Sequence, residues 1–186
     1  MTDILFLDFD GVLHPLFPRT DRTHEENQHF EGCSRLANVL DRVAPRIKIV
    51  VSSTWRYKRS MEELRALVGP LAGRLIGMTP ILNRQEDGIR EMEAQQWLDR
   101  YTRNHTRPIV RWCALDDMPS LWTSREKLLV TGDGFRTMDA IALSNNIDAM
   151  LDAVETAPSF MEREAKIWLP NPNGEEPEIG DIIEFG

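Results

Sequence analysis

Two aspartates near the N-terminus are the residues whose types and spacing most directly suggest chemistry. Asp8 and Asp10 follow a short apolar run, residues 4–7, and are followed by Gly11. The run is typical of a buried strand, and strand alternation would place both carboxylates on the same side of the backbone. Carboxylates this close repel each other, so a protein keeps them together mainly where a cation or an acid/base task uses them. Mg²⁺ suits such an all-oxygen site. The alternative is an ordinary strand followed by an Asp/Gly turn.

Other polar residues stand at comparable places further along the chain. Each follows an apolar run or begins a predicted helix, so each can carry chemistry at the end of a structural element. They are Ser52 and Ser53 after residues 47–51, Asp116 and Asp117 after residues 109–115, and Arg90 at the start of a predicted helix.

The elements that must position these residues alternate between two kinds of pattern. Apolar, β-branched runs predict strands, and apolar residues at three- and four-residue spacing predict helices. Such alternation predicts an α/β fold with a central, mainly parallel sheet covered on both faces, and ligands bind such sheets at the carboxyl ends of the strands. The predicted strands are 4–7, 47–51, 75–78, 109–115 and 128–130, and the predicted helices are 34–44, 60–68, 90–103 and 138–155.

The stretch Asp8-Phe9-Asp10-Gly11-Val12-Leu13-His14 resembles motif I of the haloacid dehalogenase (HAD) superfamily of phosphatases and phosphotransferases. The spacing Arg-x-x-Glu-x-x-x-Trp-Leu that begins at Arg90 resembles a capless HAD subgroup associated with Swiss army knife RNA repair proteins. The resemblance implies a three-layer Rossmann-like fold with a short flap and no large cap domain. It also implies Mg²⁺ as cofactor and hydrolysis through an aspartyl phosphate.

Phosphoryl transfer through an aspartyl phosphate needs a nucleophile, an acid/base, a balancing cation and donors to the phosphoryl oxygens. We expect Asp8 to be the nucleophile and Asp10 the acid/base, and the resemblance implies that the Asp10 backbone carbonyl is a metal ligand. Asp116 is the better candidate for a direct metal ligand, and Asp117 either binds through water or orients the other ligands. These four aspartates are the predicted metal site.

The phosphate-binding residues predicted from the sequence leave alternatives open. Ser52 aligns best with the motif II hydroxyl, but a shift of one residue in the strand end would exchange it with Ser53. Arg90 is the predicted motif III cation, in place of the lysine more usual in the superfamily, and Arg56 and Arg84 compete with it. Each of these residues also has a purely structural interpretation, as a turn, a helix cap or an exposed helix arginine.

Composition limits the class of protein. The 186 residues, 41% apolar and 28% charged, with a net charge of −8, are typical of a globular chain that does not adhere broadly to nucleic acid or anionic membranes. Two distant cysteines, Cys33 and Cys113, predict buried thiols and no disulfide framework or zinc site. No apolar run is long enough for a membrane span, and the start of the chain is no signal peptide. We therefore expect a soluble cytoplasmic protein without a membrane partner.

The predicted organisation is a catalytic domain over residues 1–156, with a flap at about 14–33, and an acidic, proline-containing tail over 157–186. Short apolar runs at 167–169 and 182–183 allow a small hairpin in that tail, and a mostly flexible tail is the alternative.

Substrate identity is the least determined property. The segment Trp55-Arg56-Tyr57-Lys58-Arg59 interleaves aromatic and basic residues, which can hold a phosphate backbone and stack a base. We consider His14, Trp55 and Arg56 possible substrate contacts. Nucleic-acid ends, nucleotides and other phosphomonoesters are the candidate substrates. The alternative function is a non-catalytic phosphate-binding or regulatory module on the same fold.

Overall fold

A single five-stranded sheet organises the part of the chain that the structure describes. The computed structural model describes residues 2–153, apart from residue 19 and residues 25–27, 83–85 and 105–109. All strands are parallel, in the order β3-β2-β1-β4-β5, and every predicted strand is present to within a residue or two. The strands are β1 (Thr2–Leu7), β2 (Lys48–Val51), β3 (Leu75–Met78), β4 (Val110–Asp116) and β5 (Leu128–Val130).

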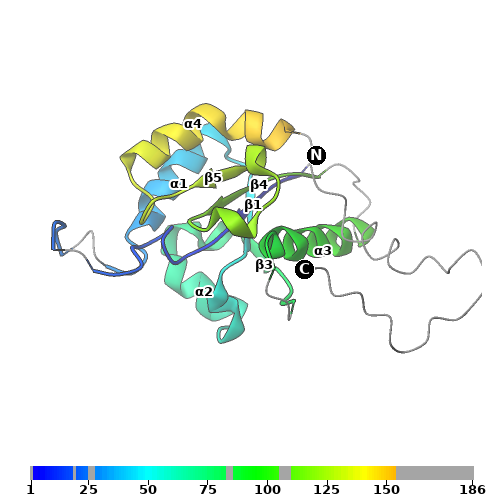
Figure 1. Cartoon of the computed structure of the whole chain (residues 1–186), viewed down its shortest axis with the longest axis horizontal. Helices are drawn as coiled ribbons and strands as arrows, with labels where there is room; N and C mark the ends of the chain where they lie inside the picture. The colour runs from blue at the N-terminus through cyan, green and yellow to red at the C-terminus, as the bar shows by residue number, and fades with distance from the viewer. Residues whose placement is uncertain (1, 19, 25–27, 83–85, 105–109, 154–186) are drawn as a thin grey trace, which may run out of the picture.

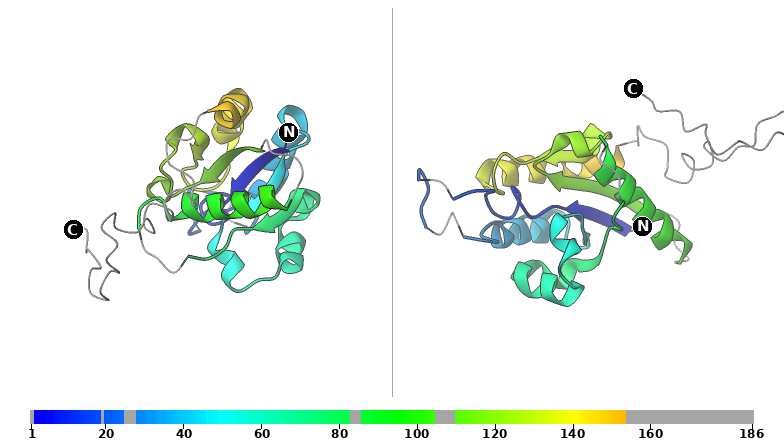
Figure 2. Two further views of the ribbon diagram at one scale, coloured as in Figure 1. Left: turned by 90° about the vertical axis from the view of Figure 1, so that its right-hand side faces the viewer. Right: turned by 60° about the horizontal axis from the view of Figure 1, so that its bottom comes forward.

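Helices cover both faces of the sheet and make a three-layer fold (Figures 1 and 2). Two helices, α1 and α4, pack side by side on one face, and α3 crosses the other face. A capping box precedes helix α2: the Ser60 side chain accepts the Glu63 backbone N–H, and the Glu63 carboxylate accepts the Ser60 backbone N–H. The helices are α1 (Gly32–Val43), α2 (Met61–Val68), α3 (Ile89–Arg103) and α4 (Thr137–Asp152).

The alternation of side chains along β1 fills two separate cores. Leu5 and Leu7 pack in the core on the α1 and α4 side, whereas Ile4 and Phe6 pack in the core on the α3 side. Phe6 meets Trp112 of β4 edge to face, with 5.8 Å between ring centroids. Asp8 continues the series of residues 4 and 6, so the same alternation directs its side chain toward the α3 side of the sheet.

The connection between β1 and α1 is a loop that projects beyond the carboxyl ends of the strands (Figure 1). Its described residues form no helix or strand element, which agrees with the predicted short flap without a cap domain. Asp133, after β5, ties the loop down: its carboxylate accepts the backbone N–H of Leu16 at 3.1 Å and pairs with Arg22 at 2.7 Å. The predicted tail hairpin, and the last residues of the predicted helix 138–155, lie outside the described residues.

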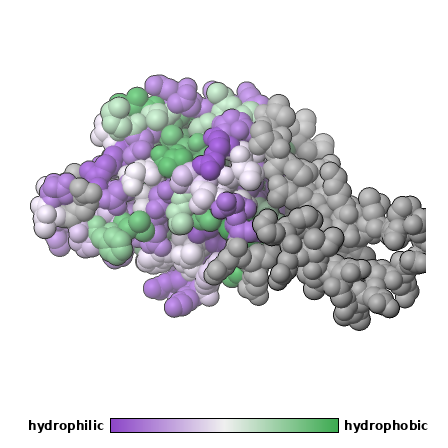
Figure 3. All heavy atoms as spheres, in the orientation of Figure 1, coloured by the Kyte–Doolittle hydropathy of each residue, from purple (hydrophilic) through white to green (hydrophobic). Residues whose placement is uncertain are grey.

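No helix among the described residues is both long enough and apolar enough to cross a membrane. On the face of the molecule seen in Figure 3, hydrophobic and hydrophilic side chains are interspersed over the body of the domain.

Candidate active site

The predicted chemical groups gather where parallel strands end. Backbone hydrogen bonds continue one residue past the strands, from Asp8 N to Leu115 O at 3.0 Å and from Ser52 N to Leu7 O at 2.9 Å. These bonds fix the first residue after each strand relative to its neighbour. Asp8 and Ser52 therefore begin their loops side by side, at the edge where the fold places a ligand.

Three of the four predicted metal-binding aspartates form one cluster. Oxygen atoms of Asp8, Asp116 and Asp117 all lie within 4.8 Å of one another, and Asp8 and Asp116 are buried. The Asp116 carboxylate accepts the Trp122 indole N–H at 2.9 Å and the Met118 N–H at 2.8 Å, which fixes its orientation. Gly11 is packed so closely against Asp117 that a Cβ at this position would lie 2.3 Å from an Asp117 oxygen. Only glycine at position 11 therefore leaves room for the Asp117 side chain in the cluster.

The cluster holds more negative charge than the protein around it balances. Burial, opposed by Arg90 and reinforced by the neighbouring Asp116, raises the pKa of Asp8 from 3.8 to about 7. Burial and then Asp116 raise the pKa of Asp117 to about 6, and burial also raises the pKa of Asp116. A divalent cation would supply the missing positive charge. The hard carboxylate oxygens of these three residues fit Mg²⁺.

Arg90 faces the nucleophile candidate from the start of α3. Its Nη1 lies 3.5 Å from Asp8 Oδ1, and both side chains are buried. Neither of these two atoms has a hydrogen-bond partner among the described residues. Gly88, with φ of 76°, turns the chain into the helix just ahead of Arg90. Of the competing arginines, Arg84 lies outside the described residues.

Asp10 stands apart from the acidic cluster and is held by two N–H donors. The Trp55 indole N–H lies 2.9 Å from Asp10 Oδ1, and His14 Nε2 lies 3.0 Å from the same oxygen. His14 Nδ1 accepts the Phe30 backbone N–H at 3.4 Å, so the proton of the neutral ring is on Nε2 and points at Asp10. Burial lowers the pKa of His14, which keeps the ring neutral. Two of the predicted substrate contacts, His14 and Trp55, therefore contact the predicted acid/base.

Both serines after β2 are buried, and the structure gives them different surroundings. The Ser52 hydroxyl has no hydrogen-bond partner among the described residues. The Ser53 hydroxyl accepts the Trp55 backbone N–H at 3.4 Å and hydrogen-bonds to Asp8, which lowers the pKa of that carboxyl. Ser52 is thus the hydroxyl with an unused donor, and Ser53 is the one that already contacts the nucleophile candidate.

Arg56 does not occupy the position expected of a substrate contact. Its side chain turns into the interior, is 1% exposed, and pairs with the equally buried Glu93. Its Nη1 also donates to the backbone oxygen of Ser53 at 2.6 Å. The 3₁₀ turn over Thr54–Tyr57 directs this side chain toward Glu93 of α3. In this position Arg56 supports the loop that follows β2.

Sequence reasoning missed the acidic residues that hold the site loops in place. Glu91 accepts the N–H groups of Thr123 and Ser124 at 2.7 and 2.8 Å, which anchors the loop after Asp116. Glu93 accepts the Leu82 N–H at 3.0 Å and so anchors the loop after β3. The sequence signal for Glu93 was its place in the Arg-x-x-Glu spacing that begins at Arg90. A charged residue on the buried side of a helix requires a partner.

Comparisons with known proteins give the family. The family described as "HAD domain in Swiss Army Knife RNA repair proteins" matches residues 4–140, which include most of β1, the acidic cluster and the start of α4. No curated protein and no solved structure matches the chain significantly. The match covers most of the chain and all the strand ends described above. The chain belongs to the family of HAD domains found in Swiss Army Knife RNA repair proteins.

Proposed function

We propose that the protein is a Mg²⁺-dependent phosphohydrolase that acts through an aspartyl phosphate on Asp8. The observation that carries this proposal is the unsatisfied pair at the strand edge. Asp8 Oδ1 and Arg90 Nη1 are 3.5 Å apart, buried, and without hydrogen-bond partners in the described part of the chain. Leaving buried polar atoms unpaired costs free energy, so such a pair is typical of a site completed by a ligand. A phosphoryl group supplies oxygens for Arg90 and an electrophile for Asp8.

The chain's own residues divide the reaction into two steps. In the first, an Asp8 oxygen forms a bond to phosphorus as the bond to the leaving oxygen breaks, and Asp10 gives that oxygen a proton. In the second, Asp10 takes a proton from water as the water oxygen attacks phosphorus, and the Asp8–phosphorus bond breaks. Arg90 neutralises charge on the phosphoryl oxygens throughout, and a hydroxyl of Ser52 or Ser53 donates a hydrogen bond to one of them.

Asp8, Asp116 and Asp117 would hold the Mg²⁺ ion, together with the backbone carbonyl of Asp10 that the family resemblance implies. The bound ion would neutralise charge on the phosphoryl group and keep Asp8 ionised in spite of its burial. His14 and Trp55 would keep the Asp10 carboxylate turned toward the leaving oxygen, because each donates one N–H to it.

The proposed substrates are phosphomonoesters: nucleic-acid ends, nucleotides or smaller esters. The family description, which concerns RNA repair proteins, favours the first of these. The short loop between β1 and α1 supports a site open to a large substrate. Two free, buried cysteines are in keeping with action in the reducing cytoplasm.

Phosphate release from a panel of phosphorylated compounds tests the proposal. The panel contains oligonucleotides with 5′- or 3′-phosphates, nucleotides and para-nitrophenyl phosphate, each with Mg²⁺ and with a chelator. We expect release by the wild type that is lost in Asp8→Asn and on chelation. Release that is the same for both proteins would contradict the proposal, and phosphate-compound binding without any release would favour the non-catalytic module.

A further inference from the structure

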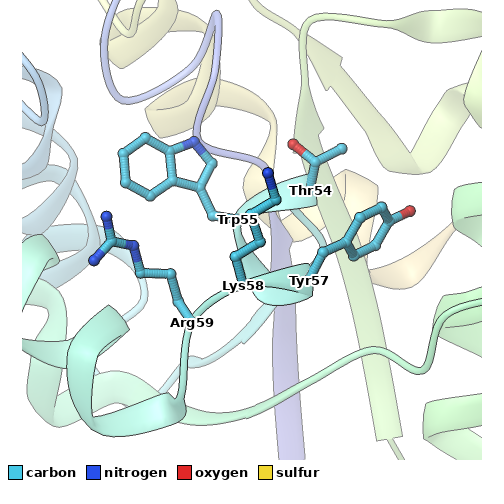
Figure 4. Close-up of a pocket in the computed structure, with 5 residues that line it drawn as sticks. All are labelled: Thr54, Trp55, Tyr57, Lys58 and Arg59. Atoms are coloured by element: carbon cyan, nitrogen blue, oxygen red, sulfur yellow. The ribbon is translucent and has the colours of Figure 1, made fainter.

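A cavity to which the proposed chemistry assigns no ligand opens beside Trp55, the residue whose indole donates to Asp10. It has a volume of about 560 Å³ and is lined by the segment that follows the serines of β2: Thr54, Trp55, Tyr57, Lys58 and Arg59. Figure 4 shows Trp55 and Tyr57 on either side of Lys58, with the Lys58 amine and the Thr54 hydroxyl pointing the same way. The volume lies within the range of roughly 300–1,000 Å³ typical of small-ligand sites.

Trp55 connects this cavity to the catalytic residues. The edge of its indole donates to Asp10, while the same ring forms a wall of the cavity. Phe30, from the loop between β1 and α1, packs edge to face against the Trp55 ring, with 5.2 Å between the ring centroids. In the proposed reaction Asp10 protonates the leaving oxygen. The cavity therefore lies on the side of the site where the leaving group departs.

The lining offers flat aromatic surface and positive charge together. Tyr57 is 52% exposed, and the guanidinium of the buried Arg56 lies 5.0 Å from its ring centroid. Arg59 lies 5.6 Å from the Trp55 ring centroid, and it forms a long ion pair, at 3.9 Å, with the exposed Glu63. Lys58 is exposed and makes no ion pair with another described residue. In a chain with a net charge of −8, two available cations beside an aromatic pair mark a place for an anion that also carries a flat ring.

We propose that this cavity binds the leaving part of the substrate, and that this part is the terminal nucleotides of a single-stranded nucleic acid. A base stacks on Tyr57, and the next phosphate of the strand meets Lys58 and Arg59. The inference rests on the proposed function, since Asp10 defines the leaving-group side. A single strand repeats flat ring and phosphate at short intervals, which matches an aromatic side chain followed at once by two cations along the chain. A phosphopeptide offers the charge without the repeated base.

Binding of the reaction product tests the proposal without requiring turnover. The probe is a fluorescently labelled single-stranded oligonucleotide with hydroxyl ends, titrated with full-length protein and followed by anisotropy. Tyr57→Ala weakens binding by at least about fivefold, the lower end of what base stacking contributes, and Tyr57→Phe, which keeps the ring, restores it. Lys58→Ala and Arg59→Ala each lower the slope of log Kd against log salt by about 0.7, the value for one phosphate contact on a single strand. Tyr57→Ala leaves that slope unchanged.

Two matched controls separate this site from general charge attraction. Arg42→Ala removes an exposed cation of α1 that is remote from the cavity, and it leaves both Kd and the salt slope unchanged. An oligonucleotide whose terminal nucleotides lack bases keeps the charge, and it binds the wild type as weakly as the complete strand binds Tyr57→Ala. Equal Kd values for wild type, Tyr57→Ala and Arg59→Ala would overturn the proposal. So would a phosphotyrosine peptide that binds more tightly than the oligonucleotide and depends on the same residues.

The outcomes also distinguish this inference from the proposed function. Oligonucleotide binding that depends on Tyr57 and Arg59, with no phosphate release from any ester, would contradict the phosphatase reaction and the leaving-group role, and it would support the cavity as a site for single-stranded nucleic acid. Phosphate release by the wild type, with oligonucleotide Kd values unchanged in Tyr57→Ala and Arg59→Ala, would support the reaction and overturn the proposal that the cavity binds the leaving group.

Discussion

Two buried arginine–carboxylate pairs lie close together in this molecule, and they are built differently. Arg56 and Glu93 are hydrogen-bonded to each other and to the backbone: Arg56 Nη1 donates to Ser53 O, and Glu93 accepts the Leu82 N–H, while Arg56 Nε has no partner among the described residues. Arg90 and Asp8 are almost as buried, yet they meet only at 3.5 Å and leave Arg90 Nη1 and Asp8 Oδ1 unpaired among the described residues. The first pair joins the loops after β2 and β3 to helix α3. We propose that a phosphoryl group completes the second pair.

The comparison teaches that burial of charge does not by itself identify a functional group. Arg56 follows the serines after β2, and Arg90 begins the Arg-x-x-Glu spacing. Each forms an ion pair with a carboxylate, Arg56 with Glu93 and Arg90 with Asp8. What separates them is the atoms that face each other: those of Arg56 and Glu93 are hydrogen-bonded, although Arg56 Nε has no partner among the described residues, whereas the facing atoms of Arg90 and Asp8 have none. The Arg90–Asp8 pair also lies beside an acidic cluster whose pKa values are raised, and we propose that it is the pair that takes part in the reaction.

The largest expected effect is on the satisfied pair. Arg56→Met lowers the free energy of unfolding by about 3–5 kcal/mol, because it leaves Glu93 buried and uncompensated. Urea denaturation of Arg56→Met, Glu93→Gln and the double variant gives the coupling energy of the pair. The same cycle on Arg90→Met and Asp8→Asn is the matched control, and we expect a smaller coupling there. Equal coupling energies in the two cycles would remove the distinction between the pairs.

The next effect is on activity and concerns Arg90. Arg90→Met lowers kcat by about 10²–10³, the scale for loss of one donor to a developing oxyanion. It changes the free energy of unfolding by less than about 1 kcal/mol, because the Asp8 carboxyl can take up a proton when its cation is removed. Arg90→Lys keeps the positive charge but not the paired N–H donors of the guanidinium, so it recovers part of the activity. A large loss of stability without a loss of kcat would assign Arg90 to the same structural role as Arg56.

A smaller effect is the dependence of metal binding on pH. The pKa of Asp8 is about 7 in the folded protein and near its usual value of 3.8 in the unfolded chain. The unfolded chain therefore loses this proton first as pH rises, so without metal the free energy of unfolding falls across the window from about pH 4 to pH 7. Mg²⁺ binds the ionised carboxylates and competes with protons.

We expect Mg²⁺ to raise Tm by several degrees at about pH 8 and by much less at about pH 5, as measured by differential scanning calorimetry. Asp116→Asn, which removes one carboxylate of the cluster, abolishes the difference between the two pH values. The same rise in Tm at both pH values would mean that the ion binds elsewhere.

The smallest effect concerns the two donors to Asp10. His14→Phe removes one N–H but keeps a ring beside Phe30, with which His14 makes an edge-to-face contact at 5.0 Å. The variant loses about tenfold more kcat/KM on an alkyl phosphate than on para-nitrophenyl phosphate, whose leaving group needs little help from a general acid. Equal losses on both substrates would show that His14 does not act through Asp10.

Much of this architecture is readable from the sequence, because it depends on local patterns. The apolar runs specify the five strands, and Ser60 with Glu63 specifies the start of α2 to within one residue. In a parallel sheet the carboxyl ends of the strands lie at one edge, where ligands bind. Because Asp8 and Asp116 stand at two such ends, this rule is enough to predict that they lie close together.

The parts that escaped prediction depend on contacts between residues distant in sequence. Arg56 turns inward because it pairs with Glu93 of α3, 37 positions later, and no periodicity near Arg56 records that. Asp133 holds the loop that contains Leu16 across 117 positions. The choice between Ser52 and Ser53 turns on a single residue of strand length. Such details are set by the packing of whole elements and not by propensity.

The most direct test of the covalent mechanism is to look for phosphate on Asp8. Asp10→Asn, which lacks the base for hydrolysis, is mixed with para-nitrophenyl phosphate and Mg²⁺, quenched in acid and analysed by peptide mass spectrometry. We predict one added phosphoryl group on the peptide that contains Asp8, and none in Asp8→Asn/Asp10→Asn. Phosphate release by the wild type without any phosphorylated Asp8 in Asp10→Asn would contradict the covalent mechanism.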